Sequence, residues 1–89
     1  MKFRLEISRQ VAKFLDKLPS DYIPKLDKIF SRLAGNPYDT GNLDIKKLRG
    51  FDRDYRLRLG KYRFLYTIFK IEGVVLIYKA DTRGDIYKK

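Results

Sequence analysis

The fold is decided by Tyr55-Arg56-Leu57-Arg58-Leu59-Gly60-Lys61-Tyr62-Arg63-Phe64-Leu65-Tyr66. Apolar and polar side chains alternate on both sides of Gly60-Lys61, which has the form of a two-residue type II′ hairpin turn with glycine first. The turn predicts four cross-strand pairs: Leu59 with Tyr62, Arg58 with Arg63, Leu57 with Phe64 and Arg56 with Leu65. Because successive side chains of a strand point to opposite faces, one face of this hairpin is apolar and aromatic. The opposite face carries Arg56, Arg58 and Arg63, and we call it the arginine face.

The arginine face is unfavourable for folding and favourable for binding anions. Like charges directly opposite across two strands, here Arg58 and Arg63, repel each other. Guanidinium groups make paired, charge-assisted hydrogen bonds to phosphate oxygens, so the cluster predicts that this face binds the phosphates of an RNA backbone. The alternative is a solvated outer face whose charge is neutralised by Asp52, Asp54 or Asp81.

The sequence after this hairpin predicts one further hairpin and a short tail. A turn at Glu72-Gly73 gives three expected pairs: Ile71 with Val74, Ile68 with Ile77 and Arg63 with Thr82. In that register Thr82 lies on the arginine face and Arg83 leaves the strand beside it. A slip of one residue would exchange the two faces of this last strand.

The sequence before the hairpin predicts a strand over residues 3–7 and two helices. Ser8 is placed to cap the first helix, whose apolar positions have helical spacing and which stops at Pro19. The second helix is expected to begin at Ser20 or Asp21 and to end at Gly35. The short connection predicts an antiparallel helical hairpin packed on the apolar face of the sheet. After a turn-rich loop at 36–43, four strands are expected at 45–48, 55–59, 62–71 and 74–80.

Length and composition agree with one α+β domain over residues 1–89. Lys and Arg outnumber Asp and Glu by 21 to 11 in 89 residues, a formal charge of +10 that favours a polyanion or an acidic protein as partner. A basic soluble domain without an anionic ligand is the plainer alternative. The chain has no Cys and no His, so we expect no disulfide, no metal site and no cofactor. No signal peptide or membrane span is recognisable, and we expect a cytoplasmic protein with no membrane partner and no small-molecule substrate.

Three segments carry a family resemblance: Lys47-Leu48-Arg49-Gly50, the Tyr55–Tyr66 hairpin, and the ending Arg83-Gly84-Asp85-Ile86-Tyr87. In this order and spacing, over nearly the whole chain, the sequence resembles the RelE/ParE superfamily of type II toxin–antitoxin toxins. The ending favours the RelE branch, whose members cleave mRNA, commonly in the ribosomal A site. The resemblance implies mRNA and the ribosome as partners, together with a cognate RelB-like antitoxin.

The resemblance also implies roles for individual residues. Arg56 and Arg58 match a basic pair that is often lysine in the family, and Arg83 and Tyr87 match its C-terminal cleavage residues. Thr82 stands where the family often has a histidine. The expected catalytic residues are Arg58, Arg63, Arg83 and Tyr87, and the expected RNA-binding residues are Lys47, Arg49, Arg56, Arg58 and Lys61. From spacing alone, Tyr87 packing on the helices and Arg83 pairing with Asp85 is an equal alternative.

The expected reaction is attack of the mRNA 2′-hydroxyl on the adjacent phosphate, without a metal. Two other functions remain open from the sequence. One is a ParE-like toxin that inhibits DNA gyrase, and the other is a non-catalytic RNA-binding domain that uses the same cationic sheet.

Overall fold

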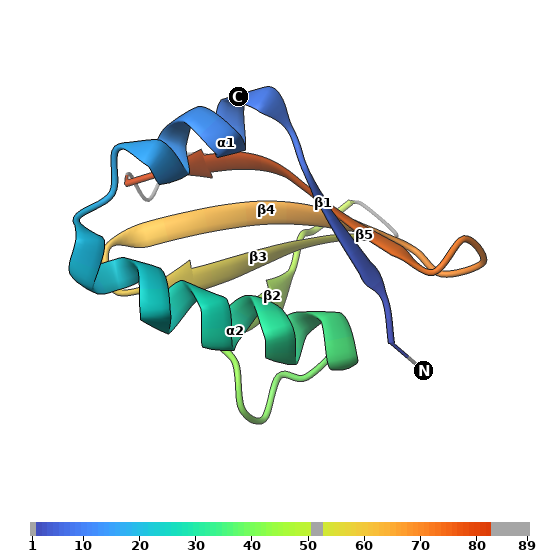
Figure 1. Cartoon of the computed structure of the whole chain (residues 1–89). Helices are drawn as coiled ribbons and strands as arrows, with labels where there is room; N and C mark the ends of the chain where they lie inside the picture. The colour runs from blue at the N-terminus through green and yellow to red at the C-terminus, as the bar shows by residue number, and fades with distance from the viewer. Residues whose placement is uncertain (1, 51–52, 83–89) are drawn as a thin grey trace.

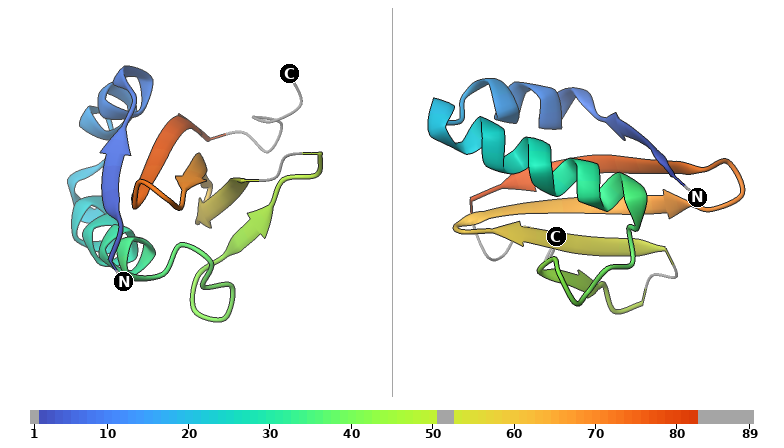
Figure 2. Two further views of the ribbon diagram at one scale, coloured as in Figure 1. Left: turned by 90° about the vertical axis from the view of Figure 1, so that its right-hand side faces the viewer. Right: turned by 60° about the horizontal axis from the view of Figure 1, so that its bottom comes forward.

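The computed structural model describes residues 2–50 and 53–82, which form a five-stranded sheet with two α-helices on one face (Figures 1 and 2). In chain order the elements are β1 (Arg4–Ile7), α1 (Arg9–Asp16), the 3-10 turn η1 (Ser20–Tyr22), α2 (Ile23–Gly35), β2 (Ile45–Lys47), β3 (Asp54–Leu59), β4 (Tyr62–Phe69) and β5 (Val74–Asp81). The strand order is β1-β5-β4-β3-β2. Only the β1–β5 pair among these strands is parallel, so the predicted α+β architecture with a mainly antiparallel meander is confirmed.

The predicted cap of the first helix and the predicted end of the second at Gly35 are confirmed, but the predicted start of the second helix is wrong. Residues 20–22 form the 3-10 turn η1, and α2 begins at Ile23 instead of Ser20 or Asp21. Ser8 caps α1, its Oγ accepting a hydrogen bond of 3.2 Å from the Val11 amide. Pro19 follows the end of α1, and Pro24 lies in the first turn of α2, where its missing amide hydrogen costs nothing. The two helices run in opposite directions across the same face of the sheet (Figure 1).

An aromatic cluster joins the helices to the sheet. The ring of Phe14 in α1 meets Tyr62 and Phe64 edge-on, at centroid separations of 5.8 and 6.0 Å. Phe30 in α2 meets Phe64 in the same manner at 5.6 Å. Edge-to-face pairs at these distances add to the stabilisation that burial provides. The apolar face of the first hairpin is therefore the face under the helices, as predicted.

The first hairpin has the predicted register. Leu59 pairs with Tyr62, and Arg58 pairs with Arg63. Gly60 has φ +59°, whereas Lys61 has no positive φ. Positive φ at only the first central residue is the signature of a type II′ turn, so the predicted turn type fits as well.

The second hairpin differs from the prediction. β4 ends at Phe69, which pairs with Val74, and Ile68 pairs with Val75 instead of Ile77. Residues 70–73 form a longer turn, in which the Gly73 amide donates to the Lys70 carbonyl at 3.2 Å. Gly73 has φ +68°, a conformation that glycine adopts without strain. The predicted two-residue turn is therefore wrong, and Ile71, 96% exposed, lies in the turn instead of the strand.

A β-bulge changes the register again further along β5. The irregularity lies opposite Leu65 and Tyr66, where Leu65 pairs with Lys79 and Tyr66 pairs with Ile77. Beyond it Arg63 pairs with Asp81, so the predicted pairing of Arg63 with Thr82 is wrong. A bulge inserts one residue and shifts every later pair, and no local sequence feature announced it.

Candidate functional site

The arginine face lies on the side of the sheet away from the helices. Arg56 and Arg58 come from β3, and Arg63 comes from β4 directly opposite Arg58. Lys46 in β2 is paired with Arg56 and therefore shares their face. The structure thus brings together the three predicted arginines, and it adds a lysine that the sequence reading missed.

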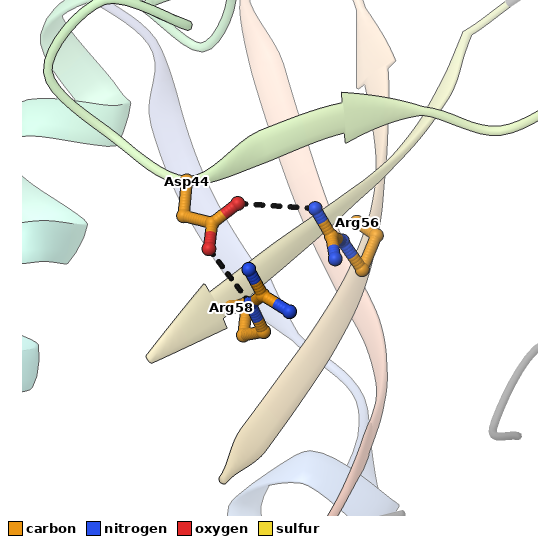
Figure 3. A network of polar contacts seen from close by, with 3 residues as sticks. All are labelled: Asp44, Arg56 and Arg58. Carbon is orange, nitrogen blue, oxygen red and sulfur yellow. Dashed lines mark hydrogen bonds and ion pairs between the residues drawn. The ribbon is translucent and has the colours of Figure 1, made fainter. Parts of the chain in front are cut away.

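Asp44 binds two of these arginines at once (Figure 3). Its Oδ1 accepts a hydrogen bond from Arg56 Nη2 at 3.1 Å, and its Oδ2 accepts one from Arg58 Nε at 2.7 Å. The Asp44 backbone carbonyl also accepts the Arg58 amide at 2.9 Å. We call this group of three residues the Asp44 clamp. The sequence predicts Asp52, Asp54 or Asp81 as the neutralising carboxylate; Asp52 lies outside the described residues, and among the described ones Asp44 forms the ion pairs with Arg56 and Arg58.

The two clamped arginines differ in exposure. The Arg58 side chain is 44% exposed, whereas that of Arg56 is 9% exposed. Arg63 is half-buried, and in the part of the chain that the structure describes no carboxylate lies within ion-pair distance of it. The buried Nε atoms of Arg56 and Arg63 have no hydrogen-bond partner among those residues. Buried donors in proteins are nearly always paired, so these two Nε atoms are exceptions. Of the two arginines, the half-buried Arg63 is the better placed to meet an anionic oxygen.

Asp54 and Asp81 have other contacts. The Asp54 carboxylate accepts hydrogen bonds from the hydroxyls of Thr67, at 2.6 Å, and Tyr78, at 3.2 Å. Burial, followed by the nearby charge of Asp54 and its hydrogen bond, raises the pKa of Tyr78 to about 12. Asp81 pairs with Arg63 in the strand register, but its Oδ1 accepts the Thr82 amide at 2.6 Å. The hydroxyl network around Asp54 therefore belongs to the sheet and not to the arginines.

The remaining predicted residues lie around the arginine face or outside the described chain. Lys47 is paired with Tyr55, which places it on the opposite face from Arg56. Arg49 is exposed in the turn after β2. Lys61 Nζ lies 5.6 Å from the ring centre of Tyr62. Arg83 and Tyr87 fall outside the described residues.

No group of three metal-ligating side chains occurs in residues 2–50 and 53–82. None of the helices there is long and apolar enough to cross a membrane. A hollow of about 860 Å³ lies between α2 and the 36–43 loop, lined by Asp27, Lys28, Ile29, Ser31, Arg32, Asn42 and Leu43. Its lining includes none of the predicted site residues.

Comparison with known proteins gives consistent matches. Toxin RelE1 of Methanocaldococcus jannaschii is 36% identical over 88 residues, which cover 99% of this chain and 98% of the relative. A chain of the archaeal RelE–RelB complex from Pyrococcus horikoshii OT3 has a TM-score of 0.83 at 32% identity, covering 94% of this chain and 98% of that one. A chain of the toxin–antitoxin complex RelBE2 from Mycobacterium tuberculosis has a TM-score of 0.75 at 25% identity, covering 93% and 100%. No family model matches.

Proposed function

Because the chain belongs to the RelE toxins of toxin–antitoxin systems, we propose that it is a cytoplasmic endoribonuclease that cuts translated mRNA on the ribosome without a metal. The observation that carries the proposal is the arrangement of Arg58 and Arg63, which face each other across β3 and β4. Two like charges in this position destabilise a sheet, whereas a phosphate between them is bound by both. Among the described residues no carboxylate lies within ion-pair distance of Arg63, although Asp81 is its cross-strand partner on β5.

The proposed reaction is an internal transfer of the phosphoryl group. The 2′-oxygen of one nucleotide attacks the adjacent phosphorus, and the bond from phosphorus to the 5′-oxygen of the next nucleotide breaks. The 2′-hydroxyl loses a proton and the departing 5′-oxygen gains one, which leaves a 2′,3′-cyclic phosphate and a 5′-hydroxyl. The phosphate gains negative charge in the transition state, so fixed guanidinium groups stabilise that state more than the substrate.

The site residues divide between holding the chain and stabilising the charge. Arg63 and Arg83 bind the scissile phosphate in this proposal, and Arg58 assists them. Arg49, Lys47 and Lys61 attract the flanking backbone through long-range charge. Arginine stays protonated and cannot accept the 2′-proton, which leaves Tyr87 as the candidate base. A phenol is a weak base near neutral pH, so positioning and electrostatics are expected to supply most of the rate.

Cleavage of ribosome-bound mRNA, with the cut ends mapped, tests the proposal. The comparison includes wild type, Arg63→Gln, Arg83→Ala and the control Arg4→Gln, which alters an exposed arginine paired with Glu6 on β1. Each site variant is expected to lose about 2–4 kcal/mol of transition-state stabilisation, which is about a 30- to 900-fold loss of rate. The control is expected to cut like wild type.

The same assay tests the partner. A +10 domain is expected to bind an acidic or amphipathic segment of a RelB-like antitoxin, which covers the arginine face or displaces the Tyr87 tail. Saturating antitoxin should then abolish cutting, and an unchanged rate would contradict this mode of neutralisation. Failure of folded wild type to cut any mRNA would refute the nuclease and favour gyrase inhibition or RNA binding without cleavage.

A further inference from the structure

The Asp44 clamp fixes Arg58 from two directions. The Asp44 carbonyl holds the backbone of Arg58 through its amide at 2.9 Å, and the carboxylate holds the guanidinium through Nε at 2.7 Å. A long, 44% exposed arginine side chain otherwise samples many rotamers, which costs free energy when it must act in one orientation. The bond through Nε leaves the two terminal nitrogens of Arg58 to face a ligand.

Arg56 is placed to act on Asp44 more than on RNA. Its side chain is 9% exposed, and its Nη2 donates to the Asp44 oxygen that Arg58 does not use. A guanidinium covered to this extent offers little surface to a polynucleotide. Its main contact is therefore with the carboxylate that orients Arg58. Asp44 lies between the two arginines and contacts both of them (Figure 3).

The charge of Asp44 works against RNA affinity. A carboxylate among cations weakens their attraction for phosphate, because each phosphate contact depends on net positive charge. A face that served affinity alone would be stronger without it. The carboxylate reduces repulsion among the arginines, which benefits folding. It benefits cleavage if the orientation of Arg58 matters more than its full charge, which is the case for a group that must meet a transition state.

On these grounds we propose that Asp44 and Arg56 are positioning residues for the proposed cleavage: Arg56 holds Asp44, and Asp44 holds the Arg58 guanidinium toward the scissile phosphate. This inference rests on the proposed function. It changes the sequence-based role of Arg56 from a direct RNA contact to an indirect one.

The central test is Asp44→Asn, measured as rate and affinity separately. Asparagine keeps the size, but its amide nitrogen donates and therefore cannot accept from the second arginine. The single-turnover rate of cutting at saturating mRNA is expected to fall by about 10- to 100-fold, because a small misplacement of a group that acts on the transition state costs about that much. Affinity for a fully 2′-O-methylated oligoribonucleotide, which lacks the attacking hydroxyl, is expected to increase. The slope of log affinity against log salt should steepen by about 0.7, the value for one more phosphate contact on a single strand.

A matched control is Asp54→Asn. It removes the same charge from the same strand face, but Asp54 contacts the hydroxyls of Thr67 and Tyr78 and not the arginines. It should increase affinity in the same direction and leave the single-turnover rate within about twofold of wild type. Arg56→Gln should lower the rate with little change in affinity. In an Arg58→Gln background, Asp44→Asn should have no further effect on the rate, because coupled residues are not additive.

Three outcomes would overturn the inference. An unchanged rate in a folded Asp44→Asn protein would make Asp44 a neutralising charge only. A faster rate would make it an inhibitory contact. Equal rate losses in Asp44→Asn and Asp54→Asn would reduce the effect to general electrostatics.

A structural measurement separates this inference from the nuclease proposal. The Nε–H resonance of Arg58 in NMR spectra should exchange slowly in wild type and Asp54→Asn, and fast in Asp44→Asn. If wild type cuts no mRNA, the proposed function fails, while loss of this protection with tighter oligonucleotide binding would retain the clamp as the group that orients Arg58. Unchanged protection in Asp44→Asn would overturn the clamp whether or not the protein cuts.

Discussion

Tyr66 ties the centre of the sheet to the loop that leads to the candidate site. It is fully buried in β4, and its hydroxyl donates a hydrogen bond of 2.7 Å to the carbonyl of Pro37. Tyr66→Phe removes this hydroxyl and keeps the ring, so that no apolar contact area is lost. The variant therefore isolates one buried hydrogen bond between β4 and the loop before Asp44.

The magnitude follows from what the substitution leaves behind. The Pro37 carbonyl loses its donor in a buried position, which costs about 1–3 kcal/mol. Near the transition temperature, each kcal/mol lowers the Tm of a domain of this size by about 4–8 °C. With a urea dependence of about 1 kcal/mol/M, the unfolding midpoint falls by about 1–3 M.

Urea unfolding followed by tyrosine fluorescence or circular dichroism measures this change. Tyr38→Phe is the control, because Tyr38 is 43% exposed and loss of an exposed hydroxyl changes stability by less than about 0.5 kcal/mol. If the free energies of unfolding of Tyr66→Phe and Tyr38→Phe agree within about 0.5 kcal/mol, the hydrogen bond to Pro37 does not hold the loop and the reasoning fails.

Two further predictions concern alkaline pH and the first turn. The pKa of Tyr78 rises from 10.0 to about 12 on folding, so the unfolded chain ionises first and stability falls as pH rises from 10.0 to about 12. Below pH 10.0 both states are protonated and the pKa difference has no effect, so urea midpoints of Tyr78→Phe should decline less than those of wild type only above that pH. Gly60→Ala, at φ +59°, should destabilise the domain by about 1–2 kcal/mol, because the left-handed conformation disfavours a Cβ. Thermal unfolding of both variants measures this loss. Gly35→Ala, where an added Cβ meets nothing within 4 Å, is the control and should not be destabilised in this way.

The sequence predicts the first hairpin and the arginine face because their determinants are local. Alternation fixes which side chains share a face, and Gly60-Lys61 fixes the register within two residues of the turn. The second hairpin lacks such a determinant, since Glu72-Gly73 fits both a two-residue turn and the end of the longer turn that forms. The bulge opposite Leu65 and Tyr66 then depends on the packing of β5 between β4 and β1, which no short segment encodes.

The position of Asp44 depends on a register that the sequence leaves open. β2 is three residues long, and its pairing with β3 decides whether Lys46 or Lys47 shares the face of Arg56. A shift of one residue would exchange the two lysines and move Asp44 to the other face. The available signal was an acidic residue one position before a short strand that neighbours the arginines. That signal becomes specific only when the β2–β3 pairing is known.

The Asp44 clamp and the facing arginines Arg58 and Arg63 show how the sheet remains stable while it carries the residues of the proposed cleavage. On the side of the sheet that faces the helices, the aromatic cluster of Phe14, Phe30 and Phe64 buries apolar surface and stabilises the fold. The outer face therefore does not have to be apolar as well. The outer face can then hold Arg58 opposite Arg63, an arrangement that costs about 0.2–1 kcal/mol by itself. Asp44 offsets repulsion on the β3 side of that pair and orients Arg58, while Arg63 forms no ion pair with a carboxylate of the described residues. A partial neutralisation of this kind leaves one guanidinium oriented and the other available, which is what two-sided binding of a single phosphate requires.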